Sequence, residues 1–238
     1  MYGYGYGSYY YYGFDWTYIL VIIAAVFSMW ASHKVNATYQ KYAKVRCMQG
    51  LTGSEAASKI LYYAGLSNIR VEHVSGKLTD HYDPKDKVLR LSDSTYNSAS
   101  VAAVGVAAHE CGHAIQDQVG YAPLKIRAML VPAANLGSKM GMPIIILGVI
   151  LSYNSMLIQV GIWVFSLAVL FQLVTLPVEF DASSRALKIL DQRGILGGEE
   201  LKMSRKVLSA AAMTYVAAAA ASVLQLIRLV SLFGRRND

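Results

Sequence analysis

His109, Glu110 and His113 are the residues of this chain whose types and spacing point most directly to chemistry. On a helix, His109 and His113 lie one turn apart, so both imidazoles project from the same face and can bind one metal ion. Glu110 is offset around the helix toward the open side of that ion, where a carboxylate can take a proton from water. This HExxH pattern is typical of zinc sites that activate water for hydrolysis.

The stretch around the motif is predicted to form a buried helix. Ser98 and Ser100 supply N-cap oxygens, the residues from Val101 onward are almost all small or apolar, and Gly120 can end the helix. An ionised Glu110 in so apolar a run would cost several kcal/mol unless an opposite charge lies beside it. We therefore predict one zinc ion per chain at this helix.

A zinc ion held by two histidines needs a third protein ligand or more, which must come from the remaining acids. Asp117 shares the face of the motif, but it lies about 12 Å along the helix axis from His109, too far for zinc bonds of about 2.0–2.2 Å. Glu179 follows Pro177, where a helix would leave the membrane. Two roles fit Glu179 equally: a metal ligand, or a helix-start carboxylate that interacts with the macrodipole. The other acids are predicted to be turn residues or the start of an amphipathic helix: Asp80, Asp83, Asp86, Glu199 and Glu200.

The composition is that of a membrane protein. The 238 residues are 55% hydrophobic and only 16% charged, and the mean hydropathy is +0.35, whereas about a quarter of the residues in a soluble domain are charged. The net charge of +7 is not gathered into a basic stripe with interleaved aromatic residues, which excludes nucleic acid as the expected partner. Cys47 and Cys111 are too few for a disulfide framework, so we expect a reducing compartment.

Changes in hydropathy along the chain predict a mainly α-helical bundle of transmembrane helices that carries a small zincin-like α+β domain on the cytoplasmic side. Basic residues follow the first span directly and recur after the last apolar hairpin, so the positive-inside rule holds both polar regions in the cytoplasm. The expected segments are a Tyr/Gly-rich segment (1–15), a transmembrane helix (16–32), the zincin-like domain (33–128), a transmembrane hairpin (129–178), a cytoplasmic segment (179–206) and a C-terminal membrane helix (207–233).

Two of these predictions leave alternatives open. The last segment, 207–233, is interrupted by Gln225 and Arg228, so it is either a fourth span or a helix packed partly against the polar domain. The uncharged connection 152–155 fits the outer turn of a hairpin. The expected membrane is the bacterial cell membrane, and the oligomeric state is left open.

Within the polar domain, we predict one helix and two strands before the HExxH helix. The helix covers Thr52–Gly65, with Ser54 as its N-cap. The strands cover 69–74 and 87–92, where apolar and polar residues alternate, and a long polar connection joins them. The second strand, KVLRLS, is either an edge strand that binds a substrate peptide by backbone pairing or part of an ordinary structural hairpin.

Three sequence stretches, HECGHAIQ, LTDHYDP and PVEFDASSRAL, resemble the YugP-like neutral zinc metallopeptidases, which are bacterial membrane proteins. The arrangement is more distantly similar to HtpX-like and CAAX-processing proteases. The resemblance implies that His109, His113 and Glu179 bind zinc and that Glu110 is the catalytic base. Where the distant relatives have an Asp four residues after the ligand Glu, this chain has Ser183.

The predicted function is that of a membrane-embedded zinc metallopeptidase, which hydrolyses a peptide or membrane-protein substrate with zinc-activated water and Glu110 as general base. The alternative is a non-catalytic membrane scaffold or regulator with a structural zinc site, which would normally have four protein ligands. The residue that stabilises the oxyanion stays open among His81, Tyr215 and Arg185.

Overall fold

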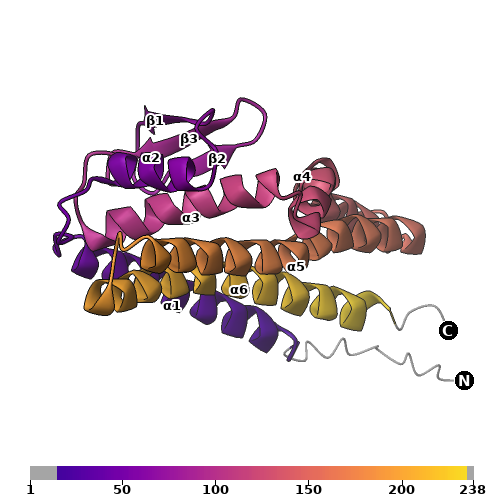
Figure 1. The fold of residues 1–238 in the computed structure, drawn as a ribbon. Coiled ribbons are helices and arrows are strands. Elements are labelled where there is room, and N and C mark those ends of the chain that lie inside the picture. The colour runs from indigo at the N-terminus through magenta and orange to yellow at the C-terminus, as the bar shows by residue number, and fades with distance from the viewer. Residues whose placement is uncertain (1–14, 235–238) are drawn as a thin grey trace, which may run out of the picture.

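A computed structural model describes residues 15–234, so all but the last residue of the Tyr/Gly-rich segment 1–15 lies outside the described residues. Six helices and one small sheet make up the fold of this described part (Figure 1). The elements are α1 (Tyr18–Tyr42), α2 (Gly53–Tyr63), β1 (Arg70–Val74), β2 (His81–Asp83), β3 (Val88–Ser92), α3 (Val101–Gln118), α4 (Ala122–Ile150), α5 (Ser155–Gln192) and α6 (Gly198–Phe233).

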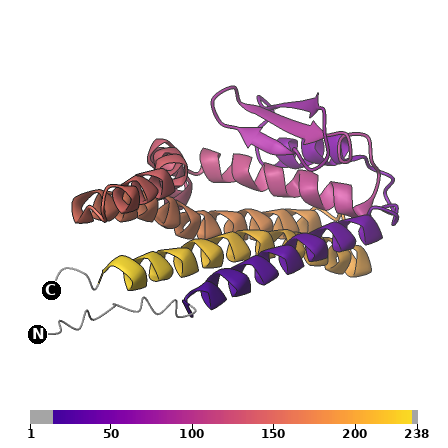
Figure 2. The same cartoon turned by 180° about the vertical axis from the view of Figure 1, so that it is seen from behind.

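Helix α3 is the central layer of the molecule. The sheet and α2 cover one side of it, and α5, α6 and the end of α1 cover the other, as the views from both sides show (Figures 1 and 2). Val101, Val104 and Cys111 of α3 are fully buried and belong to one core with Leu89 and Leu190. A helix with apolar residues on most of its surface is stable only when it is covered all round, which accounts for the alanine-rich sequence before the motif.

The sheet differs from the sequence prediction. A third strand, β2, lies inside the connection that the sequence predicts to be a loop, and the strand order is β1-β3-β2. β1 pairs with β3 in parallel, and β2 pairs with β3 in antiparallel orientation. β2 and β3 are neighbours because only the short turn 84–87 joins them, whereas the parallel pair needs the longer crossover 75–87. Of the two alternatives for KVLRLS, the edge strand is therefore wrong: β3 is central, and β2 is an edge.

Polar contacts fix the edge strand β2 against α3. The hydroxyl of Tyr82 donates to Asp117 of α3 at 2.8 Å, and Arg90 of β3 donates to Asp83 at 2.9 Å. Asp80, predicted to be a solvated turn residue, instead accepts hydrogen bonds from the backbone N–H and the hydroxyl of Ser92. Asp117 thus holds the sheet on α3, and Asp83 and Asp80 hold β2 and the residue before it to β3.

Helix caps decide where α2 and α3 begin. Thr52, not Ser54, is the N-cap of α2, because Thr52 and Glu55 form a reciprocal capping box. The prediction of Ser54 is wrong by two residues. In α3, the Ser100 side chain accepts from the backbone N–H of Ala103, as the sequence predicts. Gly120 follows the helix with a φ of +64°, a conformation that glycine adopts at little cost.

Four helices, α1, α4, α5 and α6, are long and apolar enough to cross a membrane. α4 and α5 form the predicted hairpin, joined by a turn at 151–154, and α6 includes the whole C-terminal apolar segment. The hairpin is tightly packed: a Cβ on Gly141 would lie 2.8 Å from the Phe165 Cβ. Such small residues let membrane helices approach closely.

Helix α5 runs without a break from its apolar, candidate membrane-spanning part into the polar region. Pro177 lies inside it, and Glu179 is therefore in mid-helix and not at a helix start, which removes the macrodipole role for this acid. α3 and α5 approach closely at Gly112, where any Cβ would overlap the carbonyl group of Ala182. The small residue between the two motif histidines thus lets α5 bring Glu179 to them.

Candidate metal centre

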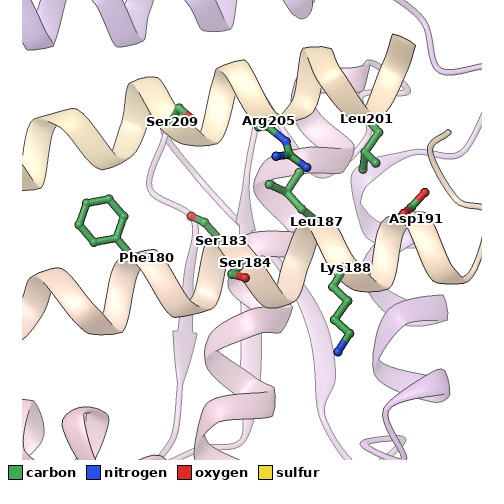
Figure 3. A pocket seen from close by; sticks show the side chains of 9 residues that line it. All are labelled: Phe180, Ser183, Ser184, Leu187, Lys188, Asp191, Leu201, Arg205 and Ser209. Atoms are coloured by element: carbon green, nitrogen blue, oxygen red, sulfur yellow. The ribbon is translucent and has the colours of Figure 1, made fainter. Parts of the chain in front are cut away.

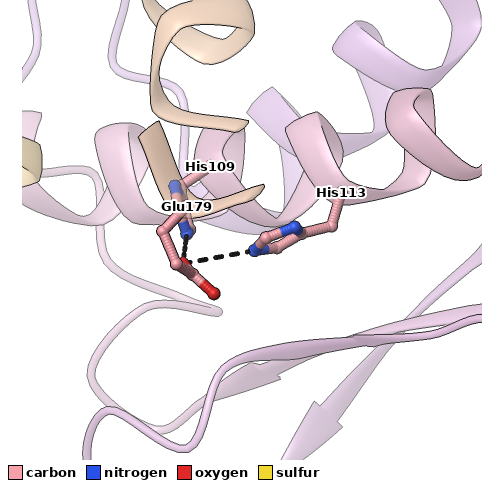
Figure 4. Close-up of side chains that lie close together, drawn as sticks. All are labelled: His109, His113 and Glu179. Carbon is pink, nitrogen blue, oxygen red and sulfur yellow. Dashed lines mark hydrogen bonds and ion pairs between the residues drawn. The ribbon is translucent and has the colours of Figure 1, made fainter. Parts of the chain in front are cut away.

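His109, His113 and Glu179 converge in space although 66 residues or more separate the acid from the histidines in sequence (Figure 4). α3 supplies the two imidazoles, whose ring centroids are 4.8 Å apart. α5 supplies the carboxylate, and its Oε2 lies 3.2 Å from the His109 Nε2 and 3.6 Å from the His113 Nε2. Among residues 15–234, this is the group of His, Cys, Asp and Glu side chains whose ligand atoms lie close enough to share an ion.

The spacing of these atoms fits zinc. Ligands in a tetrahedral zinc site lie about 2.0–2.1 Å from the ion, which places them about 3.3 Å from one another. The distances from Glu179 Oε2 to the two imidazole nitrogens agree with that value. Two imidazoles and one carboxylate are also the donor set of hydrolytic zinc sites that keep a fourth position for water.

The buried carboxylate of Glu179 lies between a cation and the two imidazoles. Its side chain is 3% exposed, and Oε1 accepts from the Arg127 guanidinium of α4 at 3.1 Å. Burial alone would lower the pKa of His113, but the nearby carboxylates of Glu179 and Glu110 outweigh burial and raise this pKa. The negative charge at the site therefore attracts cations.

Both imidazoles are held from behind, on the ring nitrogen that points away from Glu179. The His113 Nδ1 lies 3.0 Å from the Gln116 Oε1, and the amide nitrogen of Gln116 donates to the Val178 carbonyl and to Asp181, both at 2.8 Å. The His109 Nδ1 lies 3.1 Å from the Ser183 hydroxyl. Such partners fix the tautomer and the orientation of metal-binding histidines.

A pocket of about 340 Å³ lies beside the three converging side chains. Glu110 and His113 of α3 and Glu179 of α5 form one wall, β2 and its flanking residues another, and α4 and α6 complete it with Arg127 and Tyr215. Glu110 is buried against the protein, at 8% exposure, yet lines this space. The Glu110 carboxylate, the three potential metal ligands and the pocket therefore lie next to one another.

The fold distinguishes among the three candidates for oxyanion stabilisation. His81 and Tyr215 line the pocket. Arg185 does not: its guanidinium donates to Asp181 at 2.6 Å and lies over the Tyr121 ring. Arg185 therefore holds Asp181, which also accepts a hydrogen bond from Gln116.

Cys111 faces away from the donor cluster. It is fully buried, its Sγ lies 3.7 Å from the Ala57 carbonyl oxygen of α2, and burial raises the pKa of its thiol well above the usual range. A thiol that faces α2 in this way is not placed to serve as a fourth ligand.

Sequence reasoning singles out the three donors but misses the residues that support them. For Gln116 a signal exists, because it lies three residues after His113 and so shares its helix face. For Arg127, nothing in the local sequence shows that α4 brings it to Glu179. Ser183 stands out in the sequence only as a departure from the distant relatives, and its contact with His109 depends on the packing of α5 against α3.

Comparison with known proteins agrees with this geometry. Residues 17–234 match a family described as "Putative neutral zinc metallopeptidase". The chain belongs to this family. It is 47% identical over 222 residues to a protein named "Putative membrane protease YugP" from Bacillus subtilis (strain 168), an alignment that covers 93% of this chain and 98% of the relative. No solved structure matches the chain. The resemblance seen in the sequence is confirmed, and the description of the family implies a zinc site, for which the cluster on α3 and α5 is the candidate.

Proposed function

We propose that this protein is a membrane-embedded, zinc-dependent metallopeptidase that hydrolyses peptide bonds. His109, His113 and Glu179 hold one zinc ion per chain, and Glu110 is the general base. The observation that carries the proposal is the convergence of three ligand atoms from α3 and α5 beside a pocket that His113, Glu179 and Glu110 line. The family description supports the same chemistry.

The roles of the side chains follow from their positions. Bound zinc supplies Lewis acidity, which lowers the pKa of water and polarises a carbonyl group. Glu110 accepts the proton of the attacking water and returns it to the leaving amine. Tyr215 and His81 line the same space and can donate to the carbonyl oxygen as it gains charge.

The substrate in this proposal is an extended peptide or a segment of a membrane protein. Strand β2 pairs with β3 along one edge, and residues of β2 line the pocket opposite Glu110 and His113. A peptide can add to the other edge of β2 by backbone pairing. Leu124 and Val131 of α4, a candidate span, line the pocket beside this strand, so the lipid bilayer adjoins the site.

We place the site on the cytoplasmic side of the bacterial cell membrane. The polar domain, the end of α5 and the start of α6 lie at one end of the molecule, and the α4–α5 hairpin extends toward the other (Figure 1). Lys34, Lys41 and Lys188 belong to this end, and an excess of Lys and Arg is typical of cytoplasmic flanks.

A scaffold or regulator with a structural zinc site is the alternative. It would normally require four protein ligands, and Cys111, the nearest thiol in sequence, faces α2. The pocket beside the donor cluster favours a site that is open to substrate. The observations therefore favour the peptidase.

Replacement of Glu110 by Gln tests the proposal. Zinc content of the purified protein and cleavage of an unfolded casein-like substrate are measured together, with Glu199→Gln as a control because Glu199 is exposed and pairs only with Lys202 at the surface. The proposal predicts that E110Q keeps zinc and loses cleavage. Cleavage that survives E110Q unchanged would exclude Glu110 as the base. A wild-type protein that binds zinc but cleaves nothing would favour the scaffold.

A further inference from the structure

A groove of about 450 Å³ lies between α5 and α6 (Figure 3). It shares no lining residue with the pocket beside the donor cluster. Phe180, Ser183, Ser184 and Lys188 line it from α5, and Arg205 and Ser209 line it from α6. In the close-up, the Arg205 side chain reaches from α6 toward α5, and the Lys188 side chain lies at the rim of the groove and is directed away from α6.

The groove lies where two candidate membrane helices leave their apolar segments. Upstream of Phe180, the residues 156–178 of α5 are strongly apolar, and the apolar part of α6 begins at Val207. Phe180, which is 49% exposed, and Ser209 mark the end toward these segments, and Asp191 and Leu201 mark the other end. From Phe180 to Asp191 the groove follows α5 for about 16 Å, so it begins at the level of lipid headgroups and extends into water.

The groove offers cations and hydroxyls without protein partners. Among residues 15–234, no carboxylate lies within ion-pair distance of Lys188 or Arg205, and the hydroxyls of Ser184 and Ser209 form no hydrogen bond with other described groups. The one acid of the lining, Asp191, lies at the end remote from the apolar segments. Two cations and two free hydroxyls are the groups that recognise a phosphate.

We propose that this groove binds the phosphate of an anionic phospholipid, with Arg205, Lys188, Ser184 and Ser209 around the headgroup and Phe180 against the start of the acyl chains. Lipid is favoured over a soluble phosphate because Phe180 and Ser209 place one end of the groove next to the apolar segments of both helices. This binding site is separate from peptide hydrolysis, and it does not depend on whether the metal centre is catalytic.

One residue, Ser183, belongs both to the lining of the groove and to the surroundings of the metal centre. The Ser183 hydroxyl lies 3.1 Å from the His109 Nδ1, and Ser183 lines the groove. A headgroup that binds here therefore lies beside the residue that orients one of the proposed zinc ligands. Lipid composition is then expected to influence the contact between Ser183 and His109.

The test measures lipid binding to the full-length protein in detergent. Phosphatidylglycerol, phosphatidylcholine and soluble glycerol phosphate are each titrated, and the midpoint of thermal unfolding and the lipid retained in native mass spectrometry are recorded. Wild type is compared with Lys188→Gln/Arg205→Gln and with the charge-matched control Lys59→Gln/Lys77→Gln, which changes two exposed lysines of the polar domain. Zinc content reports whether each variant is folded.

We expect phosphatidylglycerol to raise the unfolding midpoint of wild type and of the control more than phosphatidylcholine does. In the double variant, its affinity should fall about tenfold or more, the factor that corresponds to the loss of one hydrogen bond to a charged group. An equal response of the double variant and the control would overturn the proposal. Equal stabilisation by glycerol phosphate would show a soluble-phosphate site and overturn the lipid assignment, as would equal binding of phosphatidylcholine.

Discussion

Gln116 accepts a hydrogen bond from the His113 Nδ1 through its Oε1, at 3.0 Å. The direction is fixed, because the Gln116 amide nitrogen already donates to Val178 and Asp181 of α5, which leaves only its oxygen for the imidazole. Nδ1 of His113 therefore carries a proton, and in the neutral imidazole this leaves Nε2, the ring nitrogen that faces Glu179, able to bind a metal ion. A single buried side chain thus ties the tautomer of a histidine on α3 to the helix that carries the third donor.

Replacement of Gln116 by Met should weaken zinc binding about 10- to 100-fold, the usual effect of removing a hydrogen-bond partner of a metal-binding histidine. Met keeps the length of the side chain but cannot hold Nδ1. Competition with a coloured chelator measures the affinity. Gln118→Met on the same helix is the control, since Gln118 is exposed. Wild-type affinity in Q116M would show that Gln116 does not orient His113.

Replacement of Ser183 by Ala should weaken zinc binding by about tenfold, because His109 loses its partner while His113 keeps Gln116. Ser183→Asp restores the acid found in the distant relatives and should bind zinc at least as tightly as wild type. The same chelator competition applies, with the exposed neighbour Ser184→Ala as control. If S183A and S184A bind zinc equally well, the contact with His109 has no orienting role.

Replacement of Tyr215 by Phe should lower kcat about 100-fold while zinc stays bound, if its hydroxyl donates to the oxyanion. Steady-state cleavage and metal analysis are measured on the same preparation. Tyr62→Phe is the control, because Tyr62 is 71% exposed and lies on α2 away from the pocket. A parallel loss of zinc and activity would instead mean that Tyr215 supports the donor cluster.

The polar domain should lose stability as the pH falls from about 4 to about 2. The hydrogen bond from Arg90 lowers the pKa of Asp83 to about 2, below the usual value near 3.9. A carboxylate with a lowered pKa stabilises the folded state above its unfolded pKa, and that contribution is lost as the pH drops through the folded value. Asp83→Asn should remove this part of the pH dependence of thermal unfolding. The same acid slope in D83N and wild type would assign it to other groups.

The two ends of the molecule should be labelled from opposite sides of the membrane. Cys47 and Cys111 are buried, so background labelling is low. With a thiol reagent that does not cross the membrane, Leu151→Cys at the hairpin turn should react in intact cells, and Lys77→Cys in the polar domain only after lysis. Reaction of both in intact cells, or of neither, would contradict the proposed topology.

The sequence by itself determined the spacing of the motif histidines and the long apolar runs. His109 and His113 are one helical turn apart in any α-helix, and apolar runs as long as those of this chain are typical of membrane spans, so both features follow from local periodicity and length. The Ser100 cap of α3 is local in the same way.

Only the tertiary structure decided which groups meet these residues. Glu179 lost its macrodipole role because α5 continues through Pro177, and Gln116, Ser183 and Arg127 gained partners through the packing of α3, α4 and α5. The role of β2 as an edge also depends on a parallel pairing between distant segments. Such contacts depend on how helices and strands are placed across long sequence separations, and no local spacing of residues encodes that placement.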